Sequence, residues 1–294
     1  MRVMLKPCLF LLVLYLSVNS VLAKSNVPCT HCPIVETVKD ASLFDANIYY
    51  RDSYRALSAG PQKLKRAIHK DINREFHTLK YKEVWSVLTY SDEEPNNHEN
   101  IRLIYKNTSI SKQHNGTGKF SRNQDYWNRE HIWPKSHGFP KRSQQGYTDI
   151  HHIKPADVSL NTQRSDNDFF NGGMPIKEAP WNKKYKSQSF EPHNGVKGDI
   201  ARMIFYMDVM YESGSHHDMP DLQVVTHHDT VRSKIEDGVG QIGDLCTLLQ
   251  WHFADPVDSF EINRNTVIYT FQANRNPFID HPEWVALLYK ADCD

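Results

Sequence analysis

The sequence lacks a surplus of charge of either sign. Among its 294 residues, 35 Lys and Arg side chains balance 35 Asp and Glu side chains. Proteins that hold nucleic acid tightly are usually basic. The balance therefore argues against a large basic binding surface, and we expect contacts with any anionic partner to be local and transient.

Long apolar runs are missing after the first two dozen residues. The segment MRVMLKPCLFLLVLYLSVNSVLA has two basic residues near its start, an apolar run over about residues 7–16, and an end at Ala23 that suits a cleavage site. Because this run is too short to cross a bilayer, it predicts a secretory signal peptide, residues 1–23, with an uncleaved anchor as the alternative. We expect residues 24–294 to form a soluble, secreted or periplasmic protein with no membrane partner.

Cysteine is scarce, with five residues in the chain, of which Cys8 lies in the predicted signal. The other four are Cys29, Cys32, Cys246 and Cys293. An even number in an exported chain predicts two disulfides, and the sequence leaves all three pairings open. We favour a structural link between the N-terminal pair and the C-terminal half over a redox role for the CxxC motif.

The remaining pattern mixes helices with a few short strands and has no internal repeat. Apolar spacing predicts helices over 61–72, 81–89 and 245–252, and a long buried helix that runs to Tyr211 with Asp199 as its N-cap. Residues 101–105 alternate as a strand does, and 265–271 are the best β-branched run near the C-terminus. These elements predict a single, mostly helical α+β domain.

Three segments within about forty residues hold the polar side chains of a catalytic site. Glu130 and His131 are adjacent in NREHIWPKSHGF. The segment TDIHHIKPAD, residues 148–157, is expected to form a short strand that Pro155 ends. We expect a helix to follow, with Asp157 or Ser159 as its N-cap. Asn161, near its start, would face back towards Glu130 and His131. The polar residues along this helix are Asn161, Gln163, Arg164 and Asn167.

This set of side chains suits the hydrolysis of a phosphodiester. A neutral His supplies a base near physiological pH. Mg²⁺ needs only one or two protein oxygen ligands because it keeps several waters, and Glu130 with the amide oxygen of Asn161 would make such a sparse site. An arginine would stabilise charge on the phosphate.

Five fragments in order resemble the bacterial endonuclease I family: NREHIWPKSHGF, TDIHHIKPAD, LNTQRSDNDF, KGDIARMIFYM and ADPVDSFEINRNTVIYTFQANRNPFIDHPEW. Members are secreted or periplasmic nucleases built around a ββα-metal finger, which would here span about residues 126–170. The resemblance implies His131 as general base, Glu130 and Asn161 as metal ligands, and Arg164 as a phosphate contact. It also implies Mg²⁺, with Mn²⁺ or Ca²⁺ as substitutes, and a nucleic-acid substrate, DNA or RNA, that is cut largely without sequence preference.

The chain departs from this family at several positions. Some relatives have an acidic residue where this chain has Tyr147, and many read Gln-Gly-Asn where it has Ala273, which would be strained if the backbone there needs positive φ. Another arginine of the family lies in a variable loop, where Lys141 or Arg142 would replace it, and Lys135 is a further candidate for binding the substrate. Because adjacent strand residues point to opposite faces, we expect an irregular backbone at Glu130 and His131, with regular pairing only after them.

Simpler readings compete with each assignment. Glu130 and His131 could form a surface ion pair, Asn161 a helix cap, and Arg164 a salt bridge to a nearby aspartate. We expect His151 and His152 to be packed structural residues, the turn at 274–278 to be packed, and the pairs 216–217 and 227–228 to be solvated. Two other functions stay open: a secreted zinc hydrolase, and a nucleic-acid-binding protein without catalytic activity.

Overall fold

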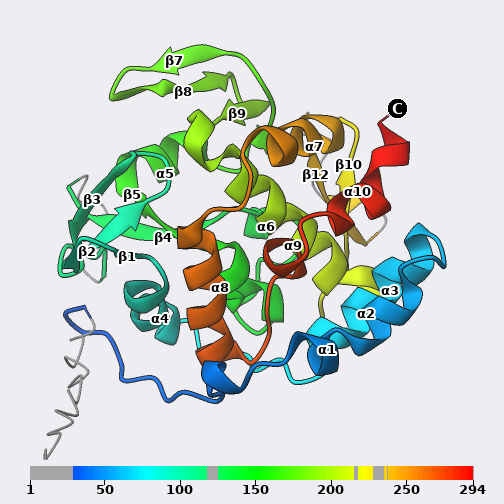
Figure 1. Ribbon diagram of the computed structural model, residues 1–294. Coiled ribbons are helices and arrows are strands. Elements are labelled where there is room, and N and C mark those ends of the chain that lie inside the picture. Colours follow the sequence, from blue (N-terminus) through cyan, green and yellow to red (C-terminus); the bar gives the residue numbers. More distant parts are fainter. Residues whose placement is uncertain (1–28, 118–124, 215–217, 228–234, 237, 294) are drawn as a thin grey trace, which may run out of the picture.

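The computed structural model describes residues 29–117, 125–214, 218–227, 235–236 and 238–293. The predicted signal peptide, His216, His217 and His228 lie outside these residues. Among the described residues, no helix is long and apolar enough to cross a membrane. The elements form one mostly helical body with four small sheets around its edge (Figure 1), which confirms the α+β class.

One central helix organises the helical body. Helix α6, Lys197–Met210, is buried at every residue from Ile200 to Met210 and packs against α3, α7 and α9. A helix that is buried on all sides belongs in a core. The other helices surround it, and their bounds are α1 Ala46–Tyr49, α2 Arg51–Ala56, α3 Pro61–Asn73, α4 Glu83–Ser91, α5 Val158–Arg164, α7 Leu245–Ala254, α8 Ser259–Gln272, α9 Pro277–Asp280 and α10 Trp284–Tyr289.

The strands are short, and most are antiparallel. They are β1 Glu93–Glu94, β2 Asn97–Leu103, β3 Thr108–Ser111, β4 Trp127–His131, β5 Ile153–Asp157, β6 Asp168–Phe169, β7 Met174–Ile176, β8 Ala179–Tyr185, β9 Ser189–Glu191, β10 Asp221–Val225, β11 Ile235–Glu236 and β12 Val239–Gly243. The sheet orders are β1-β2-β3, β4-β5, β6-β9-β8-β7 and β10-β12-β11. Two pairs, β6–β9 and β10–β12, are parallel, which the sequence did not predict.

Strands β4 and β5 with helix α5 give the strand, strand, helix order expected of the finger. The pairing is regular from Trp127 opposite Asp157 to His131 opposite Ile153. The expected irregular backbone at Glu130 and His131 is therefore wrong, since regular pairing ends at His131 instead of starting after it. Residues 148–152 are mostly 3₁₀ helix, not strand.

Pro155 does not end strand β5, contrary to expectation. It pairs with Arg129 inside the strand, and its carbonyl accepts a hydrogen bond from the Ile104 amide, 3.0 Å away. A proline lacks the amide hydrogen but keeps its acceptor. Pro155 therefore fits at a position where the chain uses its carbonyl.

Helix α8 covers the run 265–271 that favoured a strand. At its start the Asp258 side chain accepts from the Glu261 amide, and the Asp258 amide donates to the Glu261 carboxylate. This reciprocal capping box stabilises a helix start. Buried side chains on one face then outweigh the β-branched composition, so the strand expectation is wrong. Asp199 is likewise not an N-cap: α6 begins at Lys197, and Asp199 lies inside its first turn.

The disulfides are Cys29–Cys32 and Cys246–Cys293. The favoured link between the N-terminal pair and the C-terminal half is wrong, because Cys29 pairs locally and Cys293 ties the C-terminal turn to α7. Hydrogen bonds hold the N-terminal segment instead. The Val38 amide donates to the Thr270 carbonyl at 2.7 Å, and Asn115 Nδ2 donates to the Thr30 carbonyl at 3.2 Å.

Candidate active site

Glu130 and His131 end strand β4, and both are buried. Because they are consecutive residues of a regular strand, their side chains leave opposite faces. Their contacts agree with this: Glu130 bonds side chains from β2's end and α5, whereas His131 bonds the 3₁₀ segment Gln145–Thr148. The candidate site therefore lies around the end of β4.

The Glu130 carboxylate is held on one oxygen. Tyr105 Oη donates to Oε1 at 2.9 Å, and an Arg164 guanidinium nitrogen donates to the same oxygen at 3.1 Å. Burial raises the pKa of Glu130, and the charge of Arg164 opposes that rise. Within the described residues, both hydrogen bonds go to Oε1, so Oε2 is left for another partner.

Arg164 is fully buried at the end of α5. Besides Glu130, its guanidinium donates to the carbonyls of His131 at 2.9 Å and Ile132 at 2.6 Å, and it lies 4.6 Å from the centre of the Phe169 ring. The predicted salt bridge to an aspartate is replaced by one to Glu130. These protein partners hold the guanidinium in this structure, and the phosphate contact of Arg164 stays a prediction.

His131 has a defined tautomer. Its Nε2 lies 3.0 Å from the Tyr147 carbonyl oxygen. Because a carbonyl only accepts, Nε2 carries the hydrogen and Nδ1 carries the lone pair. Burial lowers the pKa of His131 well below its ordinary value, and nearby His152 lowers it further. His131 is therefore a neutral imidazole with an unprotonated, basic Nδ1 at physiological pH.

Asn161 lies beside the same strand. Asp157 caps helix α5 by accepting from the Ser159 and Leu160 amides, so Asn161 is not the cap. Asn161 Nδ2 donates to the Arg129 carbonyl at 3.4 Å, next to Glu130 in the strand. This bond uses the donor end of the amide and leaves Oδ1 as an acceptor.

The predicted substrate-binding cations lie on the His131 side. Lys135 Nζ donates to Tyr147 Oη at 3.2 Å, and the Arg142 guanidinium lies 5.2 Å from the centre of the Tyr81 ring. Burial raises the pKa of Tyr147, but the hydrogen bond and charge of Lys135 and those of Arg142 lower it overall. Lys141 is exposed nearby, with its amide bonded to Gln144.

Sequence reasoning missed the tyrosines that support this site. Tyr105 is 25 residues from Glu130 in the chain, and no local pattern links the two. Arg129 is held between aromatic rings, 3.4 Å from the centre of Tyr81 and 4.3 Å from that of Trp85. Only the fold brings these residues to β4.

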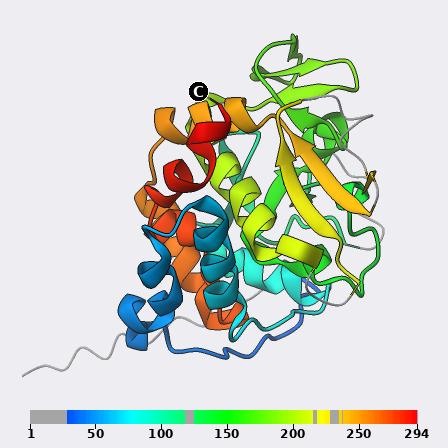
Figure 2. The same ribbon diagram turned by 90° about the vertical axis from the view of Figure 1, so that its right-hand side faces the viewer.

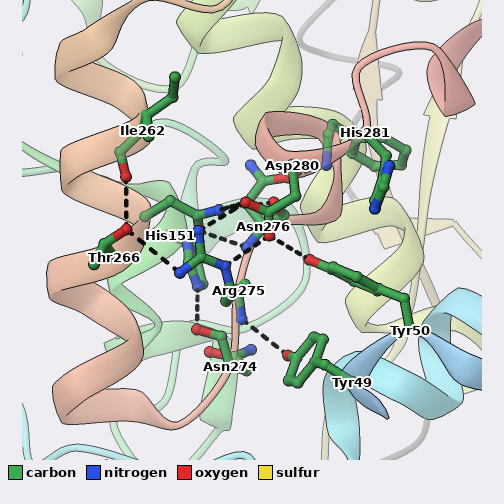
Figure 3. A network of polar contacts seen from close by, with 12 residues as sticks. Tyr49, Tyr50, His151, Ile262, Thr266, Asn274, Arg275, Asn276, Asp280 and His281 are labelled. Atoms are coloured by element: carbon green, nitrogen blue, oxygen red, sulfur yellow. Dashed lines mark hydrogen bonds and ion pairs between the residues drawn. The ribbon is translucent and has the colours of Figure 1, made fainter. Parts of the chain in front are cut away.

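The two histidines of TDIHHIKPAD, His151 and His152, are structural, as expected. His151 Nε2 bonds the Asn274 carbonyl at 3.2 Å, and His152 Nε2 bonds the Gly146 carbonyl at 2.7 Å. Figure 3 shows the adjoining turn, where Arg275 pairs with both Asp280 oxygens at 2.7 Å. This turn is packed, which confirms its interpretation as structure.

Comparison with known proteins finds a family and relatives to which this chain is similar. The family model described as Endonuclease I matches residues 61–283. Proteins named extracellular ribonuclease from Bacillus amyloliquefaciens and Bacillus subtilis (strain 168) are each 44% identical to this chain over 243 residues. The matched region covers 82% of this chain and 77% of each relative.

Proposed function

Because the chain belongs to the endonuclease I family, we propose that it is a secreted, metal-dependent endonuclease that hydrolyses phosphodiester bonds with His131 as general base. The hydrogen bond from His131 Nε2 to the Tyr147 carbonyl carries this proposal, because it leaves Nδ1 as the unprotonated nitrogen of a neutral imidazole. A base of this kind takes a proton from the attacking water. Nucleases hydrolyse phosphodiesters, which is the activity that family membership supports.

The metal proposal rests on two unused oxygens. Glu130 Oε2 and Asn161 Oδ1 make no hydrogen bond within the described residues, and both belong to side chains whose other polar atom is fixed. Two oxygen ligands suit Mg²⁺, which keeps waters and adds phosphate oxygens. When bound there, the ion would neutralise charge on the phosphate. The described residues contain no cluster of three His, Cys, Asp or Glu side chains that could hold a metal ion.

Each remaining residue has a role that follows from its contacts. Arg164 is proposed as a positioning residue, because it orients Glu130 and the carbonyls at the end of β4. Lys135, Lys141 and Arg142 are proposed to contact the phosphate backbone, since they lie on the exposed side near His131. A few such contacts predict a shallow salt dependence, with a slope of about −0.9 per phosphate on duplex DNA.

The substrate is proposed to be RNA as well as DNA, cut with little sequence preference. The relatives are named extracellular ribonuclease, which supports RNA as a substrate and supports secretion. Two disulfides suit an oxidising compartment. In this proposal, residues 1–23 are the signal peptide and residues 24–294 form the nuclease domain.

Digestion of plasmid DNA and of RNA tests the proposal. We expect cleavage that EDTA abolishes and Mg²⁺ restores, and a loss of about 10²- to 10⁴-fold in rate for His131→Ala. Lys63→Ala, an exposed change on α3, is the matched control and should cut normally. Restoration by zinc alone would favour the zinc hydrolase, and folded protein that cuts neither substrate would favour an inactive binding protein. Wild-type rates in folded His131→Ala would exclude His131 as the base.

A further inference from the structure

The β7–β8 hairpin exposes aromatic side chains that a folded protein usually buries. Trp181 is 48% exposed, Tyr185 is 47% exposed, and Met174 on the neighbouring strand is 75% exposed. Figure 1 shows this hairpin standing out from the helical body, away from helices α1–α3, and Figure 2 shows the same separation from a second side. Trp181 and Tyr185 are both exposed on β8, whose pairing with β7 shifts register between Ala179 and Lys183.

The hairpin is also basic, in a chain whose total charge is balanced. Residues 174–186 include Lys177, Lys183, Lys184 and Lys186, with Glu178 as the single acidic residue. Lys183 pairs with Glu191 at 3.1 Å, and Lys184 donates to the Gln163 carbonyl at 2.5 Å. Lys177 and Lys186 are exposed and form no ion pair with a described residue. Two lysines are thus available to an anionic partner.

The hairpin is attached to the elements that hold the candidate site. Trp181 Nε1 and Asn182 Nδ2 both donate to the Tyr105 carbonyl, at 3.1 and 2.8 Å, while the hydroxyl of the same tyrosine donates to Glu130. Lys184 and Glu178 both bond Gln163, which lies two residues after Asn161 on α5. A polymer bound at β4 therefore has this surface within reach.

We propose that the β7–β8 hairpin is a docking surface for single-stranded nucleic acid, whose bases stack on Trp181 and Tyr185 while Lys177 and Lys186 contact phosphates. This inference rests on the proposed function, which makes nucleic acid the substrate. Aromatic rings beside cations bind single strands without sequence preference, because every base has a flat face. The positive charge complements the phosphate backbone.

Exposed rings favour a single strand over a duplex. The bases of a duplex are stacked on one another about 3.4 Å apart along each strand and are paired on their other edge. A ring on the protein surface can stack only on a base that is free to leave its neighbours, as the bases of a single strand are. The surface would extend the substrate site beyond the scissile bond and lower the dissociation constant for long single strands.

Binding by a catalytically impaired protein gives the test. In the His131→Ala background, fluorescence anisotropy would follow labelled 16-nucleotide single strands of RNA and DNA and a 16-base-pair duplex. We expect Tyr185→Ala to weaken single-strand binding about fivefold or more and duplex binding much less. The double change Lys177→Gln with Lys186→Gln should reduce the salt slope by about 0.7 for each phosphate that the protein no longer neutralises. Ile48→Ala and Lys63→Gln, exposed changes on α1 and α3, are matched controls and should bind as the parent does.

The outcomes separate this inference from the proposed function. Equal losses for single strand and duplex, or unchanged affinity in both hairpin variants, would overturn the single-strand surface even if the wild-type protein cuts nucleic acid. The proposed function fails separately, if the wild-type protein cuts neither DNA nor RNA with any divalent metal. Trp181→Phe gives a second check, because it keeps a ring for stacking but loses the bond to Tyr105, so single-strand affinity should be largely retained.

Discussion

At the scale of single residues, the site depends on side chains that do not touch the substrate. Tyr105 and Arg164 both bond Glu130 Oε1, and so fix which oxygen of the carboxylate remains for a metal. The three candidate residues Glu130, His131 and Asn161 could be named from the sequence, because they lie in neighbouring fragments that resemble one family. Their supporting contacts could not, because Tyr105 is distant in the chain and the burial of Arg164 depends on where Phe169 and β4 lie.

Tyr105→Phe should weaken the response to Mg²⁺ without unfolding the protein. The change removes a hydrogen bond that orients a proposed ligand, and removing such a supporting group commonly weakens metal affinity about 10- to 100-fold. A Mg²⁺ titration of plasmid cleavage would measure it. Tyr54→Phe also removes a tyrosine hydroxyl, one bonded to His281 far from the site, and should leave the titration unchanged. An unaltered titration in Tyr105→Phe would count against Glu130 as the ligand.

Arg164→Met should destabilise the fold by about 3–5 kcal/mol, because it leaves the Glu130 charge buried without its partner. Urea denaturation would measure this loss. Adding Glu130→Gln removes that charge, so the double variant should be more stable than Arg164→Met alone. Arg142→Met, an exposed arginine in the same region, should change stability by no more than about 0.5 kcal/mol. Full stability in Arg164→Met would contradict the positioning role.

At the scale of elements, local pattern predicted helices well where one face is apolar. Helices α3, α4 and α7 occur where spacing placed them, and Pro61 opens α3 as expected. The pattern failed at α8, because its β-branched composition favours a strand whereas the capping pair Asp258 and Glu261 starts a helix. The disulfide pairing could not be predicted, since it depends on how α7 and the C-terminal turn pack.

The end of α8 contains a residue whose replacement should raise stability. Ala273 has a φ of 60°, the left-handed conformation in which a side chain is unfavourable. Alanine is therefore strained there, whereas glycine would not be. Ala273→Gly should raise the free energy of unfolding by about 0.5–1 kcal/mol. Thermal denaturation would show a higher Tm, and a lower Tm would mean that packing of the buried methyl group outweighs the strain.

At the scale of the whole molecule, burial of ionisable groups links stability to pH. His131, His151 and His152 are all buried, and the rings of His131 and His152 lie 5.5 Å apart. Burial lowers the pKa of each of the three. Burial raises the pKa of the Asp149 carboxyl, which therefore acts in the opposite direction. The contribution of one histidine to the pH dependence of stability is therefore best measured by comparing the wild type with a variant that lacks that histidine.

His152→Gln should reduce the loss of stability in acid. Burial lowers the pKa of His152 to about 3 in the folded protein, against about 6.5 when unfolded. Its contribution to stability is complete above pH 6.5 and is lost as the pH falls towards 3, because the unfolded chain binds the proton first. Relative to the variant, the wild type should lose about 1.4 kcal/mol per pH unit in that window. Urea denaturation midpoints between pH 8 and pH 4 would measure this loss of stability, with the exposed change His77→Gln as control. Parallel plots of stability against pH for the wild type and His152→Gln would refute the prediction.

The regular pairing of β4 with β5 constrains how such a chain can diverge. Within the connection between the two strands, only residues 135–136 and 140–143 are exposed, so the turn at 140–143 can lengthen or shorten without moving either strand. A single inserted or deleted residue inside Trp127–His131 would instead exchange the two faces of the strand, and Glu130 and His131 would trade places. The chain would still contain both residues, yet neither side chain would contact its present hydrogen-bond partners. We therefore expect length variation among descendants of this chain to accumulate at the exposed turn 140–143 and to be excluded from within the two strands.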